Sequence, residues 1–121
     1  MYLKVYDASY FMTKEMEPSL FVRFFGNAPI VKVLDFLIEN RIFDYSKTEI
    51  ARESGIGWST LHGIWAELEK NKIVTRTRTI GRAEMYRLNT ENLIVKKFIE
   101  LDKTFSRNYS DTLIAKKKIT A

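Results

Sequence analysis

Residues 44–74 read DYSKTEIARESGIGWSTLHGIWAELEKNKIV, and the order of helix signals in this stretch decides the fold. Ser46 and Glu49 have the spacing of a capping box, which predicts that a short helix begins at Ser46. That helix must stop near Gly55, because glycine readily takes the left-handed conformation that ends a helix. A further helix is predicted after Gly57, because apolar residues recur at spacings of three and four and form one buried stripe. The members of this stripe are Leu61, Ile64, Trp65 and Leu68.

The flanking sequence supplies a helix before this pair and a hairpin after it. Residues 26–40, GNAPIVKVLDFLIEN, combine an N-cap candidate at Asn27 and a first-turn proline at Pro29 with apolar residues at helical spacing. Residues 73–88 instead alternate β-branched and charged side chains around Gly81, as a β-hairpin does. Helix, short helix, glycine turn, helix and hairpin is the order of elements in a winged helix-turn-helix domain.

The two ends of the chain complete the predicted organisation. A fourth helix fits residues 90–106, and its apolar seam consists of Ile94, Phe98, Leu101 and Phe105. Residues 1–25 hold seven of the sixteen aromatic residues at spacings that fit neither period, so we interpret them as mixed strand and helix for core or dimer packing. Residues 107–121 are interpreted as a basic tail, either a short helix or disordered. The predicted fold class is mainly α with a small β-hairpin: a winged helix-turn-helix domain, residues 26–89, with an additional C-terminal helix.

Composition restricts the possible functions. The 121 residues suit one domain, and 45% apolar with 29% charged residues is ordinary for a soluble globular protein. The absence of cysteine, with His62 as the single histidine, leaves no usual zinc ligands, so we expect no metal and no cofactor. We find neither a glycine-rich phosphate loop nor a Ser, His and Asp arrangement that would indicate an enzyme. Without a signal peptide or an apolar span, the chain is expected to be cytoplasmic and not membrane-bound.

The basic excess is concentrated in one region. The net charge of +5 comes from 20 Lys and Arg against 15 Asp and Glu. Residues 1–45 carry five basic and six acidic groups, whereas residues 70–87 carry six basic groups against Glu84 alone. A local basic cluster suits a polyanion such as nucleic acid, and a solvated charged face is the alternative.

Three stretches resemble the winged helix-turn-helix transcriptional regulators common in archaea. The matching elements are FGNAPIVKVLDFLIEN at 25–40, the stretch at 44–74, and TRTRTIGRAEMYRLN at 75–89. The resemblance extends over about two thirds of the chain, residues 25–103, and its most specific parts are the turn SGIGWSTL and the wing RTRTIGRAEMYRLN. It implies a dimer that binds double-stranded DNA at promoters and blocks or recruits the transcription machinery.

The helix at residues 58–70 is the expected recognition helix, because a major groove of about 12 Å admits one α-helix. Its small outward residues would permit close approach, and its polar ones could bond bases or phosphates; the alternative is an ordinary exposed surface. Trp58 could equally pack against the preceding helix or stack on a deoxyribose. In the family, a basic or large polar residue often occupies the positions of Trp58 and Gly63. Recognition of the DNA sequence by this chain is therefore expected to depend on A·T-rich sites, on DNA shape or on the wing. The predicted DNA-contacting residues of the two helices are Lys47, Trp58, Ser59, Thr60, His62, Gly63 and Ala66.

The hairpin is expected to act as an arginine-bearing wing. Arg76 and Arg78 should share one face of a strand by period two, and Arg82 lies at the tip beside Gly81. All three are predicted to point at phosphates of the backbone or into the minor groove, because the planar guanidinium fork matches phosphate oxygens. The alternative is a hairpin whose edge is guarded by charge.

The seam on the fourth helix predicts a homodimer in which Ile94, Phe98, Leu101 and Phe105 meet a second copy. The alternative is that Phe98 and Leu101 only close the monomer's own core. Two further functions stay open at this point: a winged adaptor for plasmid or chromosome segregation, and a winged domain that docks on a partner protein. The N-terminal aromatic residues could also line an effector pocket or simply pack, and the sequence does not choose between these.

Overall fold

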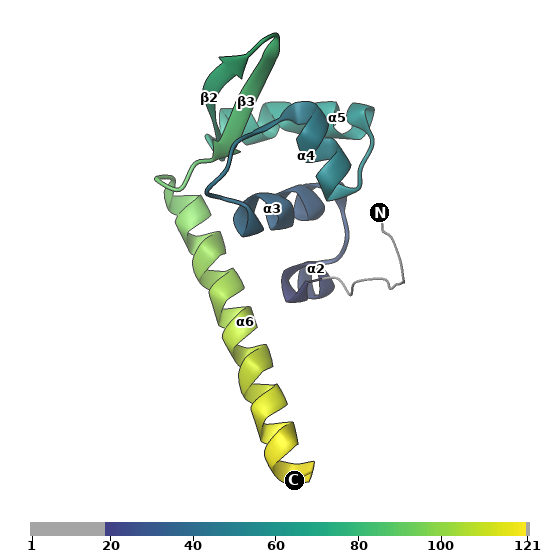
Figure 1. Cartoon of the computed structure of the whole chain (residues 1–121), viewed down its shortest axis with the longest axis vertical. Helices are drawn as coiled ribbons and strands as arrows, with labels where there is room; N and C mark the ends of the chain where they lie inside the picture. Colours follow the sequence, from purple (N-terminus) through teal and green to yellow (C-terminus); the bar gives the residue numbers. More distant parts are fainter. Residues whose placement is uncertain (1–18, 121) are drawn as a thin grey trace.

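The computed structural model describes residues 19–120, and side chains as far as Asp111. Its elements, in chain order, are α2 (Leu20–Phe25), α3 (Pro29–Glu39), β1 (Tyr45–Ser46), α4 (Lys47–Ser54), α5 (Trp58–Lys70), β2 (Val74–Ile80), β3 (Ala83–Leu88) and α6 (Leu93–Thr120). The strands form an antiparallel sheet in the order β1-β3-β2. In Figure 1 the hairpin of β2 and β3 stands at one end of the molecule, and α6 runs away towards the other. The predicted fold class is confirmed, with β1 as a short third strand.

The helix boundaries follow from local capping. Ser46 caps α4: its hydroxyl accepts from the Glu49 N–H at 3.2 Å, and the Glu49 carboxylate accepts from the Ser46 N–H at 2.8 Å. The capping box is therefore confirmed. The helix ends at Gly55, whose φ of 73° lies in the left-handed region that glycine adopts without strain.

The start of α3 differs from the prediction in one residue. Pro29 is the first helical residue, where its missing N–H costs nothing. The N-cap is Ala28, which offers no capping side chain, and the carbonyl of Ala28 accepts from the Val31 and Lys32 N–H groups at 3.0 and 3.1 Å. The prediction of Asn27 as the cap is wrong, because Asn27 lies one residue outside the capping position.

One core joins α2, α3, α4, α5, the sheet and the first two turns of α6. The predicted stripe on α5 is confirmed, with Leu61, Trp65 and Leu68 buried and Ile64 half-buried against them. From α6, Val95 enters the same core and is 1% exposed. Burial on this scale is the main stabilising contribution, at about 1.5–3 kcal/mol for each large apolar side chain.

The helix α2, which lies below α3 in Figure 1, packs against α6 through aromatic rings. Phe21 of α2 is buried and meets Phe98 of α6 edge to face, with ring centroids 6.3 Å apart. About two turns further along α6, the ring centroid of Phe105 lies 5.1 Å from that of Phe24. Within the predicted N-terminal aromatic segment, α2 confirms a helical part, and residues 1–18 lie outside the described residues.

The helix α6 is longer than predicted. It continues to Thr120, so the predicted division between a helix ending at residue 106 and a separate tail from 107 is wrong. The physical reason is that residues 107–120 contain no proline or glycine to end a helix. None of the helices within residues 19–120 is long and apolar enough to cross a membrane.

Candidate nucleic-acid interface

The outward face of α5 is uncovered in the described part of the chain. Every predicted contact residue on this face is exposed: Ser59, Thr60, His62, Gly63 and Ala66. A Cβ atom added at Gly63 would have no neighbour within 4 Å outside the backbone of its own helix, so nothing in the described structure covers this face of α5 at Gly63. The buried stripe on the opposite side fixes the orientation of α5 in the domain. The result is a helix that presents mostly small side chains to the solvent.

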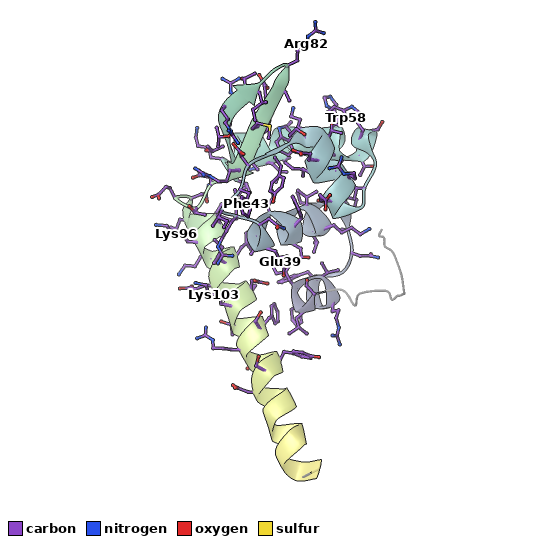
Figure 2. All side chains as sticks on the ribbon, in the orientation of Figure 1. Glu39, Phe43, Trp58, Arg82, Lys96 and Lys103 are labelled. Carbon is purple, nitrogen blue, oxygen red and sulfur yellow. The ribbon has the colours of Figure 1, made fainter. Side chains whose placement is uncertain are left out.

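Trp58 begins α5, and about half of its side chain lies in solvent, with 52% exposed. Its indole ring is 6.1 Å from the His62 ring, with the two planes tilted by 31°. Trp58 therefore does not enter the core as Trp65 does. Figure 2 shows Trp58 and Arg82 at the same end of the molecule, the end away from α6.

A hollow of about 280 Å³ lies where the starts of α4 and α5 face the tip of the wing. We call it the wing hollow; its lining residues are Ser46, Lys47, Thr48, Trp58, Arg82, Ala83, Glu84 and Tyr86. The wing hollow brings together three of the predicted DNA-contacting residues, Lys47, Trp58 and Arg82, from three separate elements. This grouping is not visible in the sequence, because 35 positions separate Lys47 from Arg82.

Lys47 is held in place by aromatic rings. Its ammonium lies 5.3 Å from the centroid of Trp65 and 5.6 Å from that of Tyr86, distances that allow cation–π attraction. The two rings meet edge to face at 4.9 Å and form one apolar platform. The fixed ammonium remains at the edge of the wing hollow, where its N–H groups can bond an anion.

The strand register separates two arginines that were expected to act together. Arg76 pairs with Tyr86 and Arg78 pairs with Met85, with an irregularity between the two pairs. Because Met85 and Tyr86 are neighbours on β3, they point to opposite faces, and so do the residues opposite them. The prediction that Arg76 and Arg78 share one face is wrong, since a β-bulge at Thr77 adds one residue to β2.

On one face, Arg76 pairs with a carboxylate of the neighbouring strand. Its Nη1 lies 3.0 Å from Oε2 of Glu84, while Oε1 of Glu84 accepts a hydrogen bond from the Tyr86 hydroxyl at 3.0 Å. The Tyr86 hydrogen bond and then Arg76 lower the pKa of Glu84, so this carboxylate stays charged. With 61% of its side chain exposed, Arg76 can still reach a further anion.

On the other face, Arg78 is tied to the loop before β1. Its Nε and Nη2 donate to the two carboxylate oxygens of Asp44 at 2.9 and 3.1 Å. The Thr77 hydroxyl adds a third hydrogen bond to Asp44 at 2.6 Å. Arg78 and then Thr77 lower the pKa of Asp44 to about 2. Sequence reasoning missed Asp44, since no local signal links residues 34 positions apart.

Arg82 lies at the tip of the wing, in the turn between β2 and β3. It follows Gly81, whose φ of 61° makes the tight turn between the strands. Figure 2 shows its side chain extending beyond the tip of the wing, and among the described side chains none forms an ion pair with it. The predicted position of Arg82 at the tip is therefore confirmed.

Acidic groups gather on the side of α3 away from the wing, where Figure 2 shows Glu39. Burial raises the pKa of Asp35, Glu39 and Asp102, and repulsion from Asp102 adds to the rise at Asp35 and Glu39. Asp35 accepts a hydrogen bond from the Ser19 hydroxyl at 2.8 Å. Partly buried carboxylates therefore lie on α3 and α6, on the side of α3 away from the wing. In the described residues, no three His, Cys, Asp or Glu side chains form a group that could hold a metal ion.

The predicted dimer residues are divided between the core and the surface. Phe98 packs against the core of its own chain, and Phe105 contacts Phe24 and Phe25 of α2. Leu101 is half-buried, and Ile94 is 50% exposed. The dimer stays a prediction, with Phe98 serving the monomer's own core.

Comparisons with known proteins connect this arrangement to solved structures only. No protein-family model and no curated protein matches the chain. MepR, a transcription regulator of the Staphylococcus aureus multidrug efflux pump MepA, aligns with a TM-score of 0.53 at 18% identity, over 69% of this chain and 60% of MepR. NadR, in complex with 4-hydroxyphenylacetate, aligns with a TM-score of 0.53 at 20% identity, over 74% of this chain and 63% of NadR.

A variant of ZitR from Lactococcus lactis in its apo form aligns with a TM-score of 0.50 at 12% identity, over 82% of this chain and 72% of ZitR. The chain spans less than two thirds of the length of MepR and NadR. Identities this low establish the shared fold alone. The chain has a winged-helix fold with a C-terminal helix.

Proposed function

We propose that this chain is a transcriptional regulator that binds double-stranded DNA as a homodimer in the cytoplasm. In this proposal α5 enters the major groove and the wing of β2 and β3 lies on the flanking backbone or minor groove. The observation that carries it is the exposed small-residue face of α5, which adjoins the cations of the wing hollow. A groove of about 12 Å accepts such a helix, and the neighbouring cations match the phosphates beside it.

The chemistry of α5 defines how bases would be read. Ser59, Thr60 and His62 can donate or accept hydrogen bonds, and Ala66 offers a methyl group to thymine. Gly63 lets the helix axis approach the base edges closely. No arginine, lysine, asparagine or glutamine lies between residues 58 and 66, so bidentate base contacts are missing from this face. Specificity would therefore come from DNA shape and A·T-rich sequence more than from hydrogen bonds.

The wing arginines take separate roles in this proposal. Arg82 and Arg76 contact phosphates, because both are exposed and Arg82 has no carboxylate partner among the described side chains. Arg78 instead fixes the wing against the loop before β1 through its two hydrogen bonds to Asp44. Each phosphate contact adds about 0.9 to the slope of log affinity against log salt.

The second copy would cover the apolar surface that α2 and α6 leave exposed. Phe24 is 70% exposed, Phe25 46% and Ile94 50%, which is unusual for large apolar side chains on two packed helices. To contact two successive turns of DNA, such a dimer would have to hold its two α5 helices about 34 Å apart. The bound site would then be pseudo-palindromic.

The test is selection of bound genomic fragments with the purified chain at low salt, with the Gly63→Glu variant as the matched control. Enrichment of pseudo-palindromic, A·T-rich sites upstream of genes is expected for the wild type and not for the variant. If both proteins recover the same fragments, with no enrichment of such sites, the proposed function is rejected.

One observation favours a second candidate, a winged domain that docks on a partner protein. Arg76 and Arg78 already pair with carboxylates in the folded chain, which shows that these guanidinium groups accept acidic side chains as partners. Unchanged DNA affinity in the double variant Arg76→Ala and Arg82→Ala would favour this candidate over the first.

A further inference from the structure

We infer that the wing hollow holds one unpaired base of DNA, stacked on Trp58. The inference rests on the proposed function, because it adds a second mode of contact to duplex binding at the same surface. Three features of the described residues carry it: the exposed indole, the size and place of the hollow, and the polar groups that line it.

Trp58 is large, aromatic and 52% exposed, beside a face whose other residues, apart from His62, are small. Trp58 does not contribute to the core, because the buried indole on the same helix is that of Trp65. Arginine, lysine, asparagine and glutamine, which make bidentate contacts to paired bases, are absent from residues 58–66. An exposed indole is instead suited to unpaired bases, because every base has an aromatic face and stacks on tryptophan without regard to sequence.

The wing hollow has room for a single base. Its volume of about 280 Å³ lies just below the ~300 Å³ at which sites for small molecules begin. It adjoins the first turn of α5, which is the part of a recognition helix that comes closest to the bases. A base that leaves the stack of a duplex bound to α5 would therefore reach the wing hollow without a change in the protein fold.

The lining of the wing hollow can bond a base and its phosphate. Lys47 and Arg82 place positive charge at the rim for the phosphate. The carboxylate of Glu84 accepts from Arg76 on one oxygen and from Tyr86 on the other. A carboxylate has about four acceptor positions, so about two remain for the amino group of a base such as cytosine.

The experiment compares two duplexes of about 20 base pairs, identical except that one carries a single unpaired cytosine, at about 50 mM salt. The wild-type chain should bind the duplex with the unpaired cytosine about fivefold or more tightly than the intact one, since one base then stacks on Trp58. Trp58→Ala should bring the ratio of the two affinities to about one, and Trp58→Phe should keep part of it. Phe43→Ala is the matched control, because Phe43 is 58% exposed and lies outside the wing hollow.

Tryptophan fluorescence gives an independent readout. Trp65 is only 2% exposed, so quenching by the duplex with the unpaired cytosine should come from Trp58 and should vanish in Trp58→Phe. A wild-type ratio of one, or a ratio that survives in Trp58→Ala, would overturn the inference while leaving duplex binding intact. Failure of the wild type to bind either duplex would overturn the proposed function as well.

Discussion

The substitution Gly63→Glu separates the stability of the fold from its proposed function. Gly63 lies in the middle of α5, and a Cβ atom there would meet nothing within 4 Å, so a side chain fits without strain. Replacing glycine by glutamate in a helix interior should add about 0.6 kcal/mol to the free energy of unfolding. Repulsion from Glu67, four residues along, should remove about 0.3 kcal/mol of this. The net gain corresponds to a rise in Tm of about 1–2 °C.

The same carboxylate should greatly weaken DNA binding. It would stand on the face that is proposed to enter the groove, where like charges placed against each other cost several kcal/mol. Affinity should therefore fall by about a hundredfold or more, at about 1.4 kcal/mol for each tenfold change. Fluorescence anisotropy with labelled duplex measures the affinity, and thermal unfolding by circular dichroism measures Tm.

Thr104→Glu is the control for charge, because it makes the same change on the exposed part of α6. It should leave DNA affinity within about twofold of the wild type. Wild-type affinity in Gly63→Glu would refute the placement of α5 in the groove. A clear fall in the Tm of Gly63→Glu would show that the space around Gly63 is not open.

Three further predictions concern the wing, a cap and the acidic group. Arg82→Ala should lower the slope of log affinity against log salt by about 0.9 per protomer, measured by anisotropy between about 50 and 200 mM salt; an unchanged slope would remove Arg82 from the interface. Ser46→Ala should lower the free energy of unfolding by about 1 kcal/mol, seen as a fall in Tm of about 5 °C by calorimetry, because the cap of α4 is lost; an equal Tm would contradict the capping box. Burial raises the pKa of Asp102, so the folded chain binds this proton more readily than the unfolded chain, and the free energy of unfolding falls as pH rises above about 4. Asp102→Asn should reduce that fall and lower the pKa of Asp35 and Glu39 in an NMR titration of their carboxyl groups; unchanged pKa values would show that Asp102 does not interact with these two groups.

Local signals in the sequence were enough to predict the helices that carry the candidate site. The capping box at Ser46, the glycine turn at Gly55 and the stripe that includes Leu61 and Trp65 each depend on residues within about one to two turns of each other. Such interactions form in any chain with the right spacing, so their positions could be read directly. The exposed face of α5 followed from the same stripe, because the buried residues determine which side remains.

The features that were missed depend on contacts between distant residues or on backbone irregularity. The bulge at Thr77 puts Arg76 and Arg78 on opposite faces, and strict alternation along a strand cannot reveal it. The partnership of Arg78 with Asp44 joins residues that only the folded sheet brings together. The wing hollow likewise requires the packing of α4 against α5 and β3, so Lys47, Trp58 and Arg82 could be proposed singly but not as one site.

The central claim is that DNA contacts the exposed face of α5 and the tip of the wing. The most direct measurement is NMR mapping of backbone amide shifts in the labelled chain as a selected duplex is added to saturation. The proposed interface predicts large shifts at Ser59, His62, Gly63 and Arg82, with residues 104–111 of α6 unchanged. Shifts confined to α6, or no shifts at α5 with the duplex bound, would contradict it.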